Sequence, residues 1–184
     1  MVGKVLPTTL QLHTAYLLRS LLIETPDRWR KALFDPEAHT ITARYLLFTD
    51  GSFNDSHATG GGGFFIMDRH TNTTYRGGSH LHPIFDPLDS EYDGMILGLL
   101  YLLKLAPGSV LILPNSSTLL HIIRRPHRLF RPIDECVSRI LDLINDLLTA
   151  RSFLRPLVTI VYGGYNVGQD SVDACFPSRF ELAY

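Results

Sequence analysis

The chain alternates between segments whose apolar residues have helical spacing and short apolar runs that are typical of strands. Residues 9–23 and 26–34 show helical spacing near the amino terminus, and residues 35–43 have the composition of a linker. From residue 44 the pattern changes to that of an α/β domain. We therefore expect a helical amino-terminal extension over residues 1–43, followed by one domain over residues 44–184.

Within this domain, strands come first and then alternate with helices. The predicted strands are residues 45–49, 64–67, 74–79, 110–113 and 157–162, and the predicted helical segments are residues 90–105, 116–123, 133–149 and 170–175. Turns separate the first three strands, including a predicted loop with four glycines at residues 60–63, so these strands should form an antiparallel meander. Helices precede the last two strands, which predicts parallel pairing in a mixed five-stranded α/β sheet.

Composition narrows the class of protein. Of the 184 residues, 45% are hydrophobic and 19% are charged, which indicates a packed core. The net charge of −1 means that nucleic-acid binding would depend on a local basic patch. The two cysteines lack metal-ligand spacing and indicate a reducing compartment. We find no apolar run long enough for a signal peptide or a membrane span, and so expect a soluble intracellular protein, cytoplasmic or nuclear.

Three carboxylates lie where predicted strands end or predicted helices begin. Asp50 follows the first strand, Glu91 lies in the first turn of the long helix, and Asp173 lies in the last helical segment. Carboxylates at such positions can bind Mg²⁺ or Mn²⁺ and support phosphodiester cleavage. From the residues alone, the alternative is a turn-forming Asp50, a helix-capping Glu91 and a solvated Asp173.

Four short motifs resemble those of the type 1 ribonuclease H (RNase H) family, in the same order and on the same kinds of element. They are Thr49-Asp50-Gly51-Ser52, Ser90-Glu91-Tyr92, residues 111–117 (LILPNSS) and Asp170-Ser171-Val172-Asp173-Ala174. The similarity covers residues 44–180. It implies an RNase H-like fold with helices on both faces of the sheet, and cleavage of RNA in RNA/DNA hybrids. By the same resemblance Asp50, Glu91 and Asp173 are metal ligands, and Asn115 takes the fourth catalytic position.

Two positions depart from the family pattern. Asn115 stands where the family has an aspartate, and Gly163 stands where the family commonly has a histidine. An amide oxygen can coordinate a metal ion but adds no negative charge, and glycine cannot handle a proton. Asn115 is either native or a substitution introduced to trap substrate. Two departures together favour natural loss of activity.

A basic segment and two polar residues are candidate nucleic-acid contacts. The candidates are Ser52, Asn54, Arg124, Arg125, Arg128 and Arg131. Arginine binds phosphate through a planar fork without reading sequence. The arginine segment resembles a shortened form of the basic protrusion of bacterial family members. The alternative is that these arginines pair with nearby acids such as Asp134 and Glu135.

The amino-terminal helices loosely resemble the connection that precedes the RNase H domain of reverse transcriptases, which implies contact with a larger polymerase or protein assembly. The alternative is that they cover one face of the sheet. We favour an RNase H-like nucleic-acid-binding module from a retroelement, a pseudoenzyme with weak or lost cleavage. The other hypotheses are an active Mg²⁺-dependent endonuclease and a protein-interaction module on the same fold.

Overall fold

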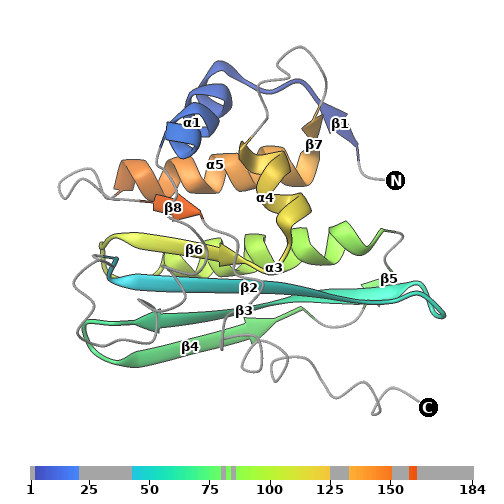
Figure 1. Ribbon diagram of the computed structural model, residues 1–184, viewed down its shortest axis with the longest axis horizontal. Helices are drawn as coiled ribbons and strands as arrows, with labels where there is room; N and C mark the ends of the chain where they lie inside the picture. The colour runs from blue at the N-terminus through green and yellow to red at the C-terminus, as the bar shows by residue number, and fades with distance from the viewer. Residues whose placement is uncertain are drawn as a thin grey trace.

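A mixed sheet forms the centre of the computed structural model, which describes residues 3–20, 43–79, 82–83, 86–124, 133–150 and 158–160 (Figure 1). Its main strands are β2 (Tyr45–Asn54), β3 (Thr59–Asp68), β4 (Thr73–Gly78), β6 (Val110–Pro114) and β8 (Val158–Ile160). The strand order is β4-β3-β2-β6-β8. Strands β2, β3 and β4 are antiparallel neighbours, while β6 pairs in parallel with both β2 and β8. The predicted antiparallel pairing of the first three strands and the parallel pairing of the last two are confirmed.

The described helices are stacked outward from this sheet. They are α1 (Thr9–Ser20), α3 (Pro87–Leu102), α4 (Ser117–Arg124) and α5 (Glu135–Ala150). Helix α3 lies on β2 and β3, α5 packs on α3, and α1 packs on α5 and α4 (Figure 1). Helix α1 reaches the sheet at its margin, on β8. The expectation that this helix covers a sheet face is therefore corrected, because its main contacts are with other helices.

Alternating side chains divide β2 between the two faces of the sheet, as the pleat requires. Tyr45 and Leu47 join the large core that includes α3, α4 and α5, whereas Leu46 and Phe48 belong to a smaller cluster on the other face. In the described part of the chain, helices α3, α4 and α5 contribute residues to the large core, and no helix contributes to the smaller cluster. The final predicted helical segment, residues 170–175, lies outside the described residues.

The hairpin of β2 and β3 is longer than predicted. Strand β2 does not end at Asp50 but continues to Asn54. Residues 60–63 are not a loop, because all four glycines belong to β3 and pair with β2. Glycine is usually unfavourable in a strand, but here the lack of side chains makes room for a helix on top. A further two-residue strand, β5 (His82–Pro83), pairs with β3 and adds to the five predicted strands.

Two helices begin elsewhere than predicted. Helix α3 begins at Pro87, and Asp86 is its N-cap, accepting a hydrogen bond from Leu88 N at 2.9 Å. Glu91 therefore lies in the second turn. The predicted helix from residue 133 begins at Glu135, because β7 (Ile133–Asp134) pairs antiparallel with β1 (Lys4–Val5). The Asp-Pro pair is a local start signal, whereas the β1–β7 pairing depends on a distant partner.

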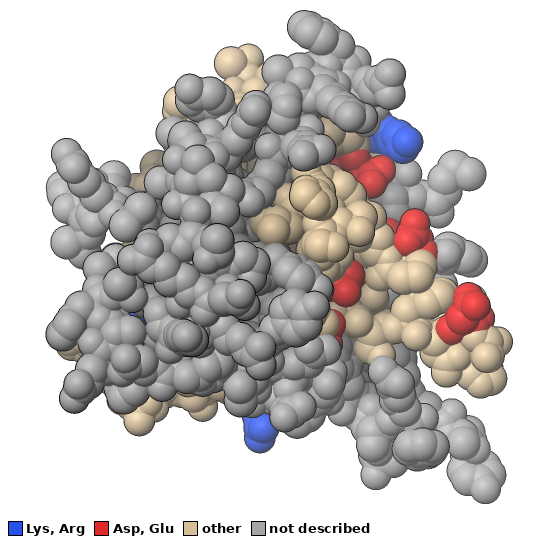
Figure 2. Space-filling view, in the orientation of Figure 1, with Lys and Arg blue, Asp and Glu red and all other residues tan. Residues whose placement is uncertain are grey.

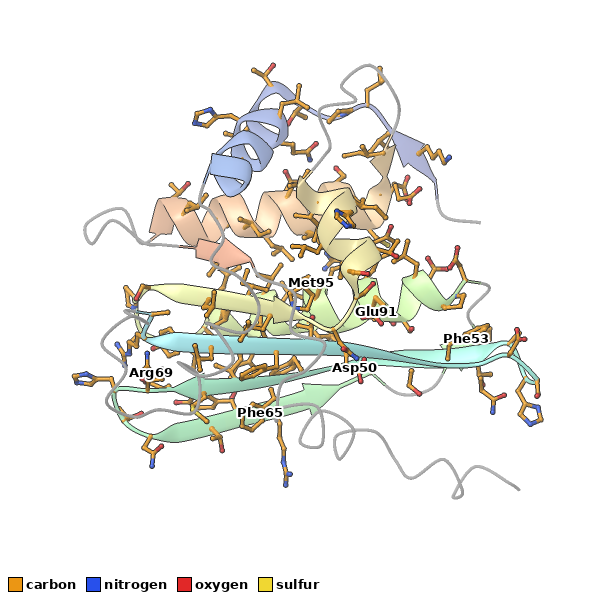
Figure 3. The ribbon with its side chains drawn as sticks, viewed as in Figure 1. Asp50, Phe53, Phe65, Arg69, Glu91 and Met95 are labelled. Carbon is orange, nitrogen blue, oxygen red and sulfur yellow. The ribbon has the colours of Figure 1, made fainter. Side chains whose placement is uncertain are left out.

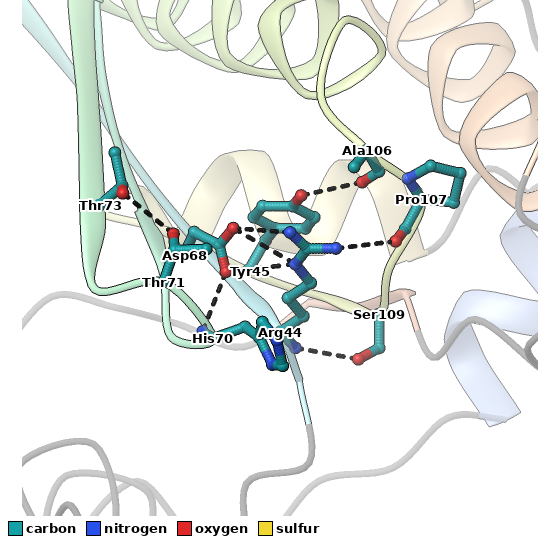
Figure 4. A network of polar contacts seen from close by, with 9 residues as sticks. All are labelled: Arg44, Tyr45, Asp68, His70, Thr71, Thr73, Ala106, Pro107 and Ser109. Carbon is teal, nitrogen blue, oxygen red and sulfur yellow. Dashed lines mark hydrogen bonds and ion pairs between the residues drawn. The ribbon is translucent and has the colours of Figure 1, made fainter.

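A polar network connects three chain segments at the far end of the sheet (Figure 4). The guanidinium of Arg44 donates to both carboxylate oxygens of Asp68 and to the carbonyl of Pro107. The Tyr45 hydroxyl donates to the Ala106 carbonyl at 2.9 Å. The ion pair raises the pKa of Arg44 and lowers that of Asp68, with side-chain hydrogen bonding as the largest cause in both. This network joins the beginning of β2, the end of β3 and the loop that precedes β6.

The described part of the amino-terminal extension is packed on the domain. Thr8 and Gln11 form a capping box: Gln11 N donates to Thr8 Oγ1, and Thr8 N donates to Gln11 Oε1. The Gln11 amide nitrogen also donates to Ser138 and Asp142 on α5, and only 3% of Gln11 is exposed. The predicted helix over residues 26–34 lies outside the described residues. Within the described ranges, no helix has the length and apolarity required to cross a membrane.

Candidate functional site

The candidate site lies where β2 passes the end of β6. Thr49 pairs with Pro114 in the parallel ladder, so Asp50 is the next residue on β2 and Asn115 is the first residue after β6. Asn115 N donates to the Thr49 carbonyl at 2.9 Å, which extends the ladder by one bond. Asp50 is 7% exposed. The carboxyl ends of parallel strands are the usual ligand positions in open α/β sheets.

One carboxylate oxygen of Asp50 already accepts two hydrogen bonds from the protein. Asn115 Nδ2 donates to Asp50 Oδ1 at 2.9 Å, and Gly51 N donates to the same oxygen at 2.9 Å. The side-chain amide of Asn115 thus presents its nitrogen to Asp50. An aspartate at position 115 would place a second negative charge there and would need a proton or a cation between the two groups.

Glu91 approaches Asp50 from helix α3, and Figure 3 shows the two side chains on adjoining elements. The pKa of Glu91 is raised to about 8; burial is the largest cause, the charge of Asp50 adds to the rise, and a hydrogen bond involving the Gly51 backbone partly opposes it. Glu91 Oε2 is buried and has no hydrogen-bond partner. Thr49 Oγ1, on the residue before Asp50, is also buried without a hydrogen-bond partner. A buried oxygen without a partner is costly, and a bound cation or a proton would reduce that cost.

Glycine residues let α3 lie against the sheet backbone beside Asp50. A Cβ on Gly94 would lie 2.7 Å from the Asp50 carbonyl oxygen and 2.8 Å from that of Gly63, and a Cβ on Gly62 would overlap the backbone nitrogen of Gly94. These contacts are with backbone atoms, which cannot rotate away. The close approach of helix and sheet brings the second turn of α3, with Glu91, next to Asp50.

The neighbours of Glu91 on α3 are held by hydrogen bonds. Ser90 Oγ donates to the Pro87 carbonyl at 2.6 Å, within the first turn. The Tyr92 hydroxyl donates to Asp134 Oδ2 at 3.2 Å, which joins α3 to β7. Tyr92 is 1% exposed, and burial, followed by the charge of Asp134, raises its pKa well above the usual value. These contacts restrain the helix on both sides of Glu91.

Acidic side chains surround the start of α3. Figure 2 shows Asp and Glu side chains on the right-hand part of this face, with few basic ones among the described residues. Burial raises the pKa of Asp89, followed by the charges of Asp86 and Asp134, with a smaller rise from Asp93. This part of the surface repels phosphate, so a nucleic acid would need attraction from elsewhere in the molecule.

The other predicted site residues are placed only in part. Ser52 is half-buried on β2, and Asn54 is exposed at the end of that strand, where its Oδ1 accepts a hydrogen bond from Ser56 N. Arg124 is the last residue of α4, and its side chain is not described. The remaining predicted residues lie outside the described residues: Arg125, Arg128, Arg131, Gly163 and Asp173. The structure therefore brings Asp50, Glu91 and Asn115 together, and their chemical roles stay predictions.

The described residues fit one divalent ion better than two. In the part of the chain that is described, no group of three or more histidine, cysteine, aspartate or glutamate side chains could hold a metal ion. The site offers two carboxylates and one amide, and Mg²⁺ binds through one or two carboxylates with retained waters. The unpartnered Oε2 of Glu91 is the feature that suits a cation. Two ions would need further ligands.

The mixed sheet with an antiparallel meander, followed by parallel strands reached through helices, defines an RNase H-like α/β domain. The model of the family described as reverse transcriptase-like matches residues 48–154, more than half of the chain, and the chain belongs to that family. The matched region includes Asp50, Glu91 and Asn115. A search of curated proteins finds no match.

Two similar solved structures are ribonucleases H1. One is from the halophilic archaeon Halobacterium salinarum NRC-1, with 15% sequence identity, a TM-score of 0.49, and coverage of 72% of this chain and 93% of that chain. The other is LC11-RNase H1 in complex with an RNA/DNA hybrid, with 20% identity, a TM-score of 0.46, and coverage of 64% of this chain and 83% of that chain.

Proposed function

We propose that this chain is an RNase H-like module that binds RNA/DNA hybrid or another nucleic acid and cleaves RNA weakly or not at all. The observation that supports weak or lost cleavage most directly is the 2.9 Å hydrogen bond from Asn115 Nδ2 to Asp50 Oδ1. Because Gly51 N donates to the same oxygen, two lone pairs that could coordinate a metal ion already have partners. A two-metal site that used this oxygen would have to displace these bonds.

The nucleic-acid side of the proposal rests on family membership and on the four arginines within residues 124–131. The acidic side chains at the start of α3 oppose phosphate binding, so the arginines have to supply the attraction. Binding through phosphate contacts depends strongly on salt and only weakly on base sequence.

The binding test uses a fluorescently labelled RNA/DNA hybrid and anisotropy measured over a salt series in EDTA. We expect the affinity to fall as salt rises, with a slope of about 0.9 for each phosphate contact on a double-logarithmic plot. A variant with Arg124, Arg125, Arg128 and Arg131 changed to glutamine should bind several-fold more weakly and show a smaller slope. Lys104→Gln, which removes one positive charge at an exposed position after α3, serves as the control. No binding at low salt would contradict the proposal.

An active nuclease is the second candidate, because Asp50 and Glu91 lie together and Glu91 Oε2 lacks a partner. In that case Asp50, Glu91 and Asp173 would hold Mg²⁺ or Mn²⁺, which stabilises the charge that develops in phosphodiester cleavage and activates water. Asn115 would orient Asp50 through its amide hydrogen bond. The chain supplies no histidine at position 163 to handle the proton.

Cleavage of a labelled hybrid in Mg²⁺ and in Mn²⁺ separates the two candidates. We expect little or no cleavage by the wild type and a gain of at least about tenfold in Asn115→Asp, since restoring the carboxylate restores a charged ligand. Asp50→Ala controls for a contaminating nuclease. Efficient cleavage by the wild type that Asp50→Ala abolishes would favour the active enzyme over the binding module.

A further inference from the structure

Strand β7 directly follows the arginine segment, residues 124–131, which supplies the phosphate contacts in the proposed function. The segment begins at Arg124, the last residue of α4, and β7 begins at Ile133, two residues after the segment ends. At the α4 end, Ile123 is buried in the large core. The other end depends on β7, which has only two residues. A strand so short needs partners that keep it in place.

The amino-terminal segment supports β7 from one side. Strand β1 pairs antiparallel with β7, with Val5 opposite Ile133. One residue beyond this pairing, Glu135 N donates to the Gly3 carbonyl at 3.1 Å. Ile133 also packs, half-buried, against the large core. The pairing with β1 therefore restrains the residues that lie between the arginine segment and α5.

Helix α3 supports β7 from the other side. The Tyr92 hydroxyl donates to Asp134 Oδ2 at 3.2 Å, and Tyr92 is only 1% exposed, so packing fixes the position of the donor. Tyr92 directly follows Glu91 in the sequence. Strand β7 is therefore tied to the helix that bears Glu91, and the arginine segment ends two residues before that strand.

From these contacts we propose that β1 is a positioning element for nucleic-acid binding, because its pairing with β7 holds the carboxyl-terminal end of the arginine segment beside α3. The inference rests on the proposed function, since it takes the arginines as the phosphate contacts. Ordering a segment of long side chains opposes binding, and fixing one end of the segment in advance lowers this entropic cost. Residues 3–5 therefore raise the affinity for hybrid without contacting it.

Val5→Pro tests this role of β1, because proline lacks the N–H group that strand pairing uses. Binding of labelled RNA/DNA hybrid is measured by fluorescence anisotropy over a salt series in EDTA, after thermal unfolding has shown that the variant is folded. We expect Val5→Pro to bind about three- to tenfold more weakly than the wild type, with a smaller salt slope. Val5→Thr keeps the N–H group and a β-branched side chain, so it should bind within about twofold of the wild type.

A double-variant cycle separates positioning from a general loss of stability. In a chain whose four arginines in residues 124–131 are changed to glutamine, Val5→Pro should have little further effect on hybrid affinity. An equal loss of affinity with and without the arginines would overturn the inference, because β1 would then support the whole fold. Tyr45→Phe is the stability control, since it removes the bond to the Ala106 carbonyl at the far end of the sheet and should leave affinity unchanged.

If Val5→Pro does not fold, Tyr92→Phe decides in its place, because it releases β7 from α3 by removing one hydroxyl. It should weaken binding in the chain with the arginines and have little effect in the chain without them. A folded Val5→Pro variant that binds like the wild type would overturn this inference and leave the proposed function intact. If the wild type does not bind hybrid, the proposed function fails and this inference fails with it.

Discussion

Glu91 connects the geometry of the site to the pH dependence of stability. Its side chain is mostly buried beside Asp50, and its pKa is raised from 4.5 to about 8. The folded chain therefore binds this proton more tightly than the unfolded chain does. Between pH 4.5 and pH 8 the unfolded state binds fewer protons than the folded state, so the contribution of Glu91 to stability falls as pH rises through this window.

Glu91→Gln should remove this dependence, because the amide stays neutral at every pH. We expect the variant to exceed the wild type in free energy of unfolding by about 1–3 kcal/mol at pH 8, and to match it below pH 4. Urea denaturation in EDTA over this pH range measures the difference. Asp146→Asn, at an exposed position on α5, is the control. If both variants followed the wild-type pH profile, the burial of Glu91 would not have the assigned effect.

At the scale of residues, the sequence patterns predicted the positions of Asp50, Glu91 and Asn115 in the chain, but they did not predict how these side chains interact. A motif indicates which strand or helix bears a residue, since spacing and flanking residues are local signals. Whether the Asn115 amide faces Asp50 with its nitrogen or its oxygen depends on the strand register and on the hydrogen bond that Gly51 N makes to the same carboxylate. The strand register and the Asn115–Asp50 bond join segments 65 residues apart, so no local pattern encodes them.

Among the elements, α3 shows how a close helix–sheet contact depends on one glycine. Gly94→Ala would normally favour a helix by about 0.5–1 kcal/mol. Here the new methyl group would meet the backbone oxygens of Asp50 and Gly63, so we expect a net loss of about 1–3 kcal/mol in free energy of unfolding. Chemical denaturation measures this loss.

Gly98→Ala is the matched control on the same helix. A Cβ on Gly98 would lie 2.6 Å from Leu47 Cδ1, the end of a side chain that can rotate. Its loss should therefore be smaller than that of Gly94→Ala. Equal losses in the two variants would mean that backbone contact at Gly94 does not set the position of α3.

Some of the helices and strands could be predicted from the sequence, and others could not. Apolar spacing located α1, α3, α4 and α5, and the short apolar runs located β2 and β6. It missed the continuation of β2 and β3 through the glycines, because glycine is a poor strand former unless a neighbour needs the space. It also missed the pairing of β1 with β7, since two-residue strands have no period to detect.

At the scale of the whole molecule, Gln11 joins the amino-terminal segment to the domain. Gln11→Glu keeps an acceptor for the capping box but places a carboxylate next to Asp142. We expect a loss of about 1–3 kcal/mol in free energy of unfolding, because the donated bonds to Ser138 and Asp142 disappear and two like charges meet. Adding Asp142→Asn to the same chain should recover part of the loss.

Urea denaturation, with unfolding followed by two different spectroscopic probes, checks this prediction. If residues 3–20 belong to the same cooperative unit as the sheet, all probes should report a single transition in the wild type and in the variant. An unchanged midpoint in Gln11→Glu would contradict the assigned role of the amide. Such a result would mean that the segment lies on the domain without stabilising it.

The bond from Glu135 N to the Gly3 carbonyl closes nearly the whole described chain into a loop. Contacts between residues so far apart in sequence form late, because the entropy of closing long loops opposes them. During synthesis, residues 3–5 leave the ribosome before α5 does, so they have to wait for it before they reach their final neighbours. Residues 3–5 are therefore made well before their partners on β7 and α5, and in that interval they are exposed to proteases and chaperones.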